Sequence, residues 1–178
     1  MKQLLIASLL LIGMETEPHL SELMTEPIDL GTLSQSPTVV LGKIVNIGLI
    51  DLPPPMNQHH QPFRATRVEV ELEEKITGPN TLARGTRLSI YDPMDLLDWG
   101  WTKVHDTRGV SISQVLKTYQ GTLVKAALKP GTRAIFFIGA PLKEVKAGYV
   151  MAAGGAFEAA NRRDEVVRLK NKAATPTK

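Results

Sequence analysis

The chain has 178 residues and no cysteine, so it forms no disulfide and its fold must rely on packing. The same absence excludes thiol catalysis, iron–sulfur clusters and cysteine-rich zinc sites. Aromatic residues are scarce, at 5% of the chain, and neither sign of charge dominates. The 21 Lys and Arg residues face 18 Asp and Glu residues, which leaves a net charge of +3. A balance this close to neutral does not indicate a nucleic-acid-binding surface.

A long apolar run is also missing. Residues 1–13 contain about ten apolar residues, whereas a membrane span needs about twenty, so we expect no transmembrane span. Lys2 followed by this run has the outline of an export signal, which predicts a periplasmic or secreted protein. No small-residue cleavage site follows, because Gly13 is succeeded by Met14-Glu15-Thr16-Glu17. Translation from Met14 would instead make the protein cytoplasmic, and that alternative stays open.

The rest of the chain is expected to form one domain, since about 160 residues can build a core that folds unaided. We divide it into a lead-in at 14–33, a β-barrel domain at 34–171 with a long loop or helical insertion at 92–128, and a disordered basic tail at 172–178. Most of the excess positive charge lies in 162–178. We interpret it as a helix C-terminus and its solvated end, rather than a site for anionic lipid or nucleic acid.

Five segments have the patterns of β-strands: 37–50, 63–73, 82–90, 128–138 and 147–152. The second alternates with period two, so that Val68, Val70 and Leu72 share one face while Glu69 and Glu71 share the other. A sheet with one buried and one wet side favours antiparallel pairing. We therefore predict a mainly β fold, a small five-stranded antiparallel barrel.

Turns and helices complete the expected fold. The order Leu-x-x-Gly-Thr-Arg occurs at 82–87 and at 128–133, which predicts that Gly85 and Gly131 make the same turn into two strands. Asn161, with Asp164 three residues on, fits the N-cap of a C-terminal helix with one buried face, at Val166, Val167 and Leu169. Within the insertion we expect helices at 113–118 and 122–128.

Several motifs together suggest a family. They are Leu-Ser-x-Ser-Pro at 33–37, Thr-Arg-Val-Glu-Val-Glu at 66–71, Lys-Ile-Thr-Gly-Pro at 75–79, Gly-Thr-Arg-Leu-Ser-Ile at 85–90 and Pro-Gly-Thr-Arg-Ala-Ile-Phe-Phe at 130–137. Their order over 33–157 resembles small exported bacterial β-barrel proteins similar to the netrin-like domain of tissue inhibitors of metalloproteinases. The resemblance implies an oligonucleotide/oligosaccharide-binding-type (OB-like) barrel, a fold that hosts many functions. Those inhibitors chelate their target's metal through an N-terminal cysteine, so this activity is not carried over to a cysteine-free chain.

The insertion holds the best candidate binding residues. Both tryptophans, several carboxylates and a histidine lie close together there: Asp95, Asp98, Trp99, Trp101, His105 and Asp106. Two indole rings flanking a glycine can stack on a sugar ring or on an apolar side chain of a partner. The alternative is that they plug the open end of the barrel.

Metal and catalytic sites are weaker candidates. Asp92, Asp95 and Asp98 lack the alternate spacing and closing glutamate of a calcium loop, and helix capping explains them as well. Adjacent histidines at 59–60 chelate one ion badly in extended chain. A set of Ser111 or Ser113 with His105 and an aspartate lacks a nucleophile elbow. We therefore assign no metal, no cofactor and no catalytic residue.

These observations favour a non-enzymatic, exported binding or interaction module. Its partner would be an unknown protein, peptide or glycan at the cell envelope, and no nucleic acid is expected. The alternative is a small envelope hydrolase or metal-dependent enzyme that uses the loop at 92–113.

Overall fold

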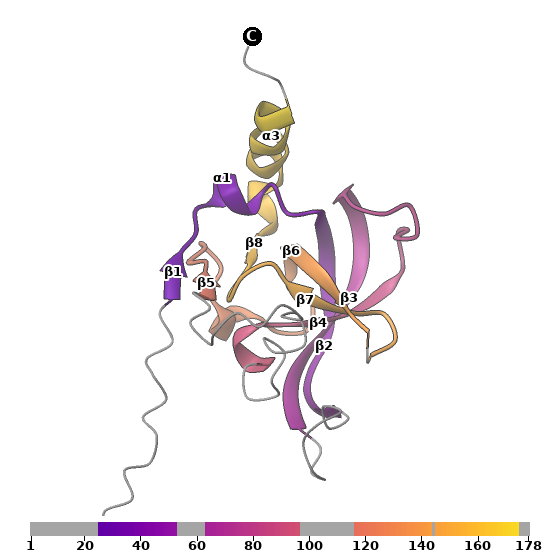
Figure 1. Ribbon diagram of the computed structural model, residues 1–178. Helices are drawn as coiled ribbons and strands as arrows, with labels where there is room; N and C mark the ends of the chain where they lie inside the picture. Colours follow the sequence, from indigo (N-terminus) through magenta and orange to yellow (C-terminus); the bar gives the residue numbers. More distant parts are fainter. Residues whose placement is uncertain (1–24, 53–62, 97–115, 144, 175–178) are drawn as a thin grey trace, which may run out of the picture.

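The computed structural model describes residues 25–52, 63–96, 116–143 and 145–174 (Figure 1). Five long or central strands are β2 (Thr38–Leu52), β3 (Phe63–Thr77), β4 (Arg87–Tyr91), β6 (Arg133–Leu142) and β7 (Gly148–Met151). The shorter elements are β1 (Thr25–Pro27), β5 (Leu116–Thr118), β8 (Phe157–Ala159), the helices α1 (Leu30–Leu33) and α3 (Arg163–Ala174), and the 3-10 turns η1 (Met94–Leu96), η2 (Lys125–Ala127) and η3 (Ala160–Arg162).

The five strands close into a barrel. Their order is β2-β3-β4-β7-β6, and β6 pairs back onto β2, which confirms the predicted small OB-like barrel. One pairing differs from the antiparallel prediction, because β4 and β7 run parallel. The antiparallel prediction assumed a sheet with one solvent-exposed face, as in β3. β7 has no such face, because its successive residues Val150 and Met151 are both buried. A strand buried on both faces is typical of parallel pairing.

The main core fills the barrel. Val70 and Leu72 of β3 are fully buried in it, as the alternation predicted, together with Leu88, Ile90 and Phe136 from other strands. β2 bends around this core, and its pairing with β3 shifts register at three places. A second, smaller cluster lies on the other face of the sheet and comprises Leu52, Ala65, Tyr91, Leu96, Leu142 and Val150.

The predicted turns and the C-terminal helix are present, with both boundaries of the helix changed. Gly85 and Gly131 both have positive φ, 85° and 90°, in the two matching turns. The helix prediction is confirmed, but Asn161 is not its N-cap: η3 already begins at Ala160, so Asn161 lies inside a helical turn. α3 continues to Ala174, past the predicted start of the tail. No helix among the described residues is long and apolar enough to cross a membrane.

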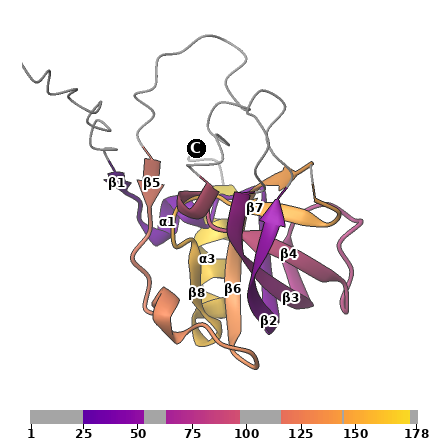
Figure 2. The same cartoon turned by 90° about the horizontal axis from the view of Figure 1, so that it is seen from below.

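The helices predicted in the insertion are wrong in their described parts. Leu116–Thr118 is the strand β5, which pairs in parallel with β1 (Figure 2). The backbone of Gly154 donates to the Lys117 carbonyl and accepts from the Tyr119 N–H, at 2.9 and 2.8 Å. These tertiary backbone bonds outweigh the local helix preference. In the second segment only Lys125–Ala127 is helical, as a single 3-10 turn.

Candidate functional site

The structure describes both ends of the insertion predicted at 92–128, but only the first residues of the predicted site. Asp92 and Asp95 lie in the first described part, whereas Trp99, Trp101, Asp98, His105 and Asp106 lie outside the described residues, as do the histidines at 59–60 and the two serines. The second described part begins at β5 and runs through η2. The contacts of these two ends therefore define what the insertion contributes to the surface.

Asp92 connects η1 to the turn at Gly155 through its carboxylate. Its Oδ1 accepts the Met94 N–H at 2.9 Å, which caps η1, and its Oδ2 accepts the Gly155 N–H at 3.0 Å. Burial raises the pKa of this carboxyl, although both N–H groups oppose the rise. Because each oxygen is already engaged, the arrangement favours the capping explanation over a metal ligand or an orienting group for His105.

Asp95 joins the two ends of the insertion. Both of its oxygens accept from Lys125 Nζ, at 2.7 and 2.8 Å, so η1 is tied to η2. The ion pair is partly exposed and contributes little stability by itself. Within the described ranges, no group of three His, Asp or Glu residues could hold a metal ion.

A hollow of about 310 Å³ lies on the second part of the insertion. Six of its eight lining residues come from 119–125: Tyr119, Gln120, Gly121, Leu123, Val124 and Lys125; the others are Gly155 and Phe157. Val124 is 60% exposed, which is unusual for a large apolar side chain. The hollow therefore presents an apolar wall with one cation, Lys125, at its lining.

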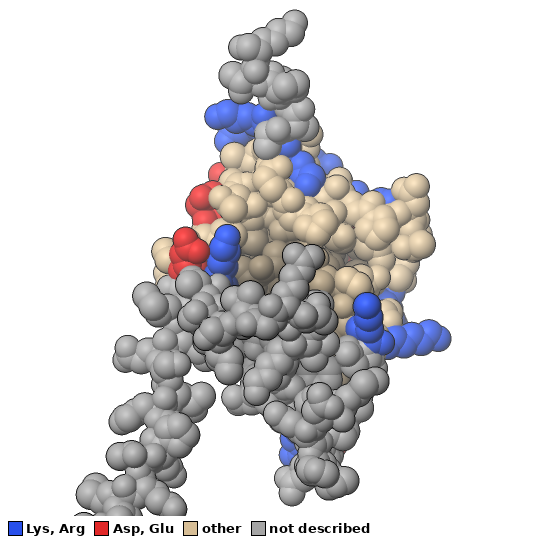
Figure 3. All heavy atoms as spheres, viewed as in Figure 1, with Lys and Arg blue, Asp and Glu red and all other residues tan. Residues whose placement is uncertain are grey.

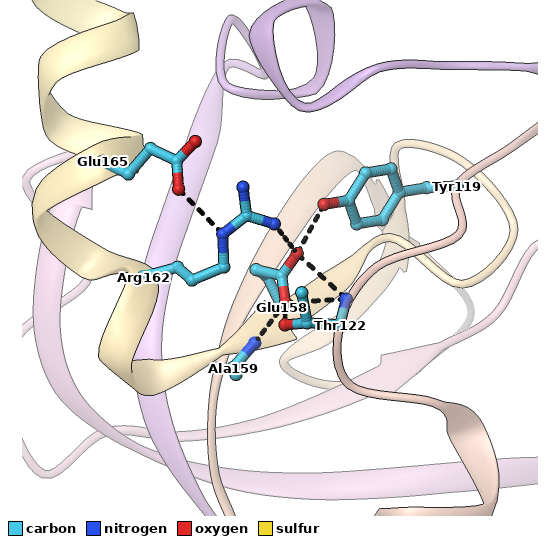
Figure 4. A network of polar contacts seen from close by, with 6 residues as sticks. All are labelled: Tyr119, Thr122, Glu158, Ala159, Arg162 and Glu165. Carbon is cyan, nitrogen blue, oxygen red and sulfur yellow. Dashed lines mark hydrogen bonds and ion pairs between the residues drawn. The ribbon is translucent and has the colours of Figure 1, made fainter.

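A buried carboxylate braces this wall (Figure 4). Glu158 of β8 is fully buried and accepts the Tyr119 hydroxyl at 2.5 Å and the Thr122 N–H at 3.1 Å. The Thr122 hydroxyl also donates to it, and the Ala159 N–H does so at 2.8 Å. Arg162 completes the set at 2.7 Å. Glu158 thus fixes Tyr119 and Thr122, at the start of the segment that lines the hollow, to β8. Through Arg162 it also links them to η3, just before α3.

The charge on Glu158 is stabilised by its partners. Burial alone would raise its pKa, but hydrogen bonds from Thr122 and Tyr119 outweigh burial and lower the pKa to about 2. The pKa of the Tyr119 hydroxyl is raised by burial and by the adjacent carboxylate. A carboxylate that stays ionised and fully bonded does not exchange protons near neutral pH. Its role here is to hold the loop in place.

The arginines at the end of η3 and the start of α3 also form ion pairs. Arg162 Nε donates to Glu165 at 2.8 Å, and Arg163 Nε bonds Glu74 of β3 at 3.0 Å. Figure 3 shows Lys and Arg side chains over α3, while much of the described barrel surface on that face is uncharged. Arg162 and Arg163, the first two residues of the basic segment at 162–178 that we interpreted as a solvated helix end, therefore anchor the helix instead.

No protein-family model matches this chain, and a search of curated proteins found no match. The site must accordingly be judged from its own geometry.

Sequence reasoning missed the brace. Glu158 is the single charged residue in Ala156-Phe157-Glu158-Ala159-Ala160, and Arg162 follows four residues later. A lone acid in an apolar run with a cation at helical spacing was the available signal. Tyr119 and Thr122 carried no such signal, because they lie far from Glu158 in sequence.

Proposed function

We propose that this protein is a non-enzymatic binding module that holds an apolar side chain of a protein or peptide partner in the hollow of the insertion. The observation that carries the proposal is the exposed side chain of Val124 in the hollow's lining, beside the partly buried Leu123 and the buried Phe157. Concave, mainly apolar surfaces with few polar groups are the usual form of such sites. Lys125 in the lining is already engaged by Asp95, so we expect the partner to be held mainly by apolar contact.

The brace beneath the hollow supports binding. Burying a carboxylate is costly, and the cost is met here by five donor groups that converge on Glu158. Three of these belong to Tyr119 and Thr122, at the start of the wall. A wall fixed before the partner arrives loses less entropy on binding. Trp99 and Trp101 lie outside the described residues, so their contact with a partner stays a separate prediction.

A photo-crosslinking amino acid at Val124 tests the proposal in living cells. We expect adducts with a foreign chain from this position and none from Ala127, which is exposed on the same turn but outside the hollow. Val124→Lys in the same chain should weaken capture of that partner about tenfold, since a charge would enter an apolar contact. Equal labelling from both positions, or binding that Val124→Lys leaves unchanged, would refute it.

We also propose that the module works outside the cytoplasm, on the strength of Lys2 and the short apolar run that follows. The intact mass of the native protein tests this. A mass that lacks the first dozen or so residues, in a periplasmic or medium fraction, is expected. An intact Met1 or Met14 terminus in the cytosol would contradict export.

A further inference from the structure

β2 has an open edge where it leaves the barrel. Its residues 38–43 pair with β6, and Ile44 still bonds the backbone of the turn at 131–132. From Val45 to Leu52 the strand pairs with β3 on one side, and no described residue pairs with it on the other. Figure 1 shows β2 and β3 continuing below the barrel as a two-stranded ribbon.

Most of this edge lacks the usual protection against pairing, and its one charged residue, Asp51, forms an ion pair with Arg64 of β3. Residues 44–50 read Ile-Val-Asn-Ile-Gly-Leu-Ile, without charge or proline. Proteins normally guard a free edge with lysine, proline or an inward charge, since unpaired N–H and C=O groups recruit another strand. The only bulge in this stretch of β2 lies at its base, beside Asn46. An unguarded edge of this composition indicates that a strand covers it.

The side chains on the ribbon point to the same conclusion. Ile47 packs against the main core, and Leu49, two residues further on the same face, is 67% exposed. The opposite face is closed, because Ile50 and Leu52 pack into the second cluster. The core face of β2 therefore extends past the end of the barrel and leaves one large apolar side chain in solvent.

We infer that a second copy of this chain pairs with β2, antiparallel, around Gly48. In that register Ile47 lies opposite Leu49 of the second copy, and the reverse pair forms on the other side of the two-fold axis. Self-pairing fits this edge because residues 44–50 carry no charge, so two positively charged copies meet without like charges at the contact. The pairing closes on itself and leaves no free edge at the contact.

Gly48 gives a direct test of the register. Residues directly opposite in an antiparallel pair have Cα atoms about 4.5–5.5 Å apart, within the range that a disulfide spans. A Cβ added at Gly48 meets nothing within 4 Å. Since the chain has no cysteine, Gly48→Cys should form one intermolecular disulfide on mild oxidation. Val124→Cys, at a more exposed position outside the edge, is the control and should form little.

Sedimentation of the full chain over a range of concentrations measures the affinity. Leu49→Lys should weaken self-association about tenfold or more, because it removes two symmetric apolar pairs, whereas Val124→Lys should not. A monomer at every concentration, or a Gly48→Cys disulfide that forms no faster than the control, would overturn the inference. Neither result bears on the hollow, whose partner is absent from the purified protein.

Discussion

Replacing Glu158 by glutamine isolates the contribution of its charge to the stability of the protein. The substitution keeps the size of the side chain but puts an NH₂ group among donors that all require an acceptor. The pKa of Glu158 is held at about 2, against 4.5 for an unperturbed glutamate. Each unit corresponds to about 1.4 kcal/mol, so the ionised carboxylate contributes about 3 kcal/mol to the free energy of unfolding.

The sign of the pH dependence follows from the lowered pKa. An acid whose pKa falls on folding stabilises the native state fully above its unfolded pKa of 4.5, and this stability is lost as the pH falls toward 2. Near pH 7 the Glu158→Gln variant should therefore unfold with about 3 kcal/mol less free energy than the parent chain. Near pH ~3 the difference should shrink to about half or less, because Glu158 is then protonated in the unfolded parent chain while it is still mostly ionised in the native one.

Urea unfolding at several pH values measures both effects. For a protein of this size the loss near neutral pH should lower the urea midpoint by about 1–3 M. Glu165→Gln is the matched control: Glu165 also bonds Arg162, but it is partly exposed, so its loss should cost at most about 1 kcal/mol. A Glu158→Gln deficit that stays constant between pH ~7 and pH ~3 would refute the assignment of stability to the charge.

The barrel was predictable because its strands carry strong local patterns. Alternation in β3 identifies the buried face, and Gly85 and Gly131 mark turns that only a residue tolerant of positive φ makes easily. The parallel β4–β7 pairing was not predictable in the same way. It depends on how the β6–β7 pair is placed against β4, and no local pattern in Gly148–Met151 identifies β4 as a neighbour.

The site was harder to predict, because its residues are arranged by contacts that are distant in sequence. β5 is a strand because Gly154 and β1 supply backbone partners, although two of its three residues, Leu116 and Lys117, do not favour a strand. Burial of Glu158 contradicts the rule that acids stay outside, and it depends in part on donors from Tyr119 and Thr122, which are distant in sequence. Where tertiary hydrogen bonds decide both conformation and burial, periodicity carries no information.

Two further substitutions test the packing around the site and the core. Asp92→Ala should destabilise the protein by about 1–2 kcal/mol in chemical unfolding, since two buried N–H groups lose their acceptor, and Asp92→Asn should cost less because its amide oxygen still accepts one. Gly42→Ala should lower the melting temperature, because its Cβ would lie 2.2 Å from Val70 Cγ1 and 2.9 Å from the Glu71 carbonyl oxygen. Overpacking of this kind costs about 1–3 kcal/mol, and the backbone oxygen cannot move aside as a side chain would. Gly48→Ala, in the same strand with open space around it, is the control. Equal melting temperatures for the two alanine variants would show that β2 and β3 do not approach each other this closely at Gly42.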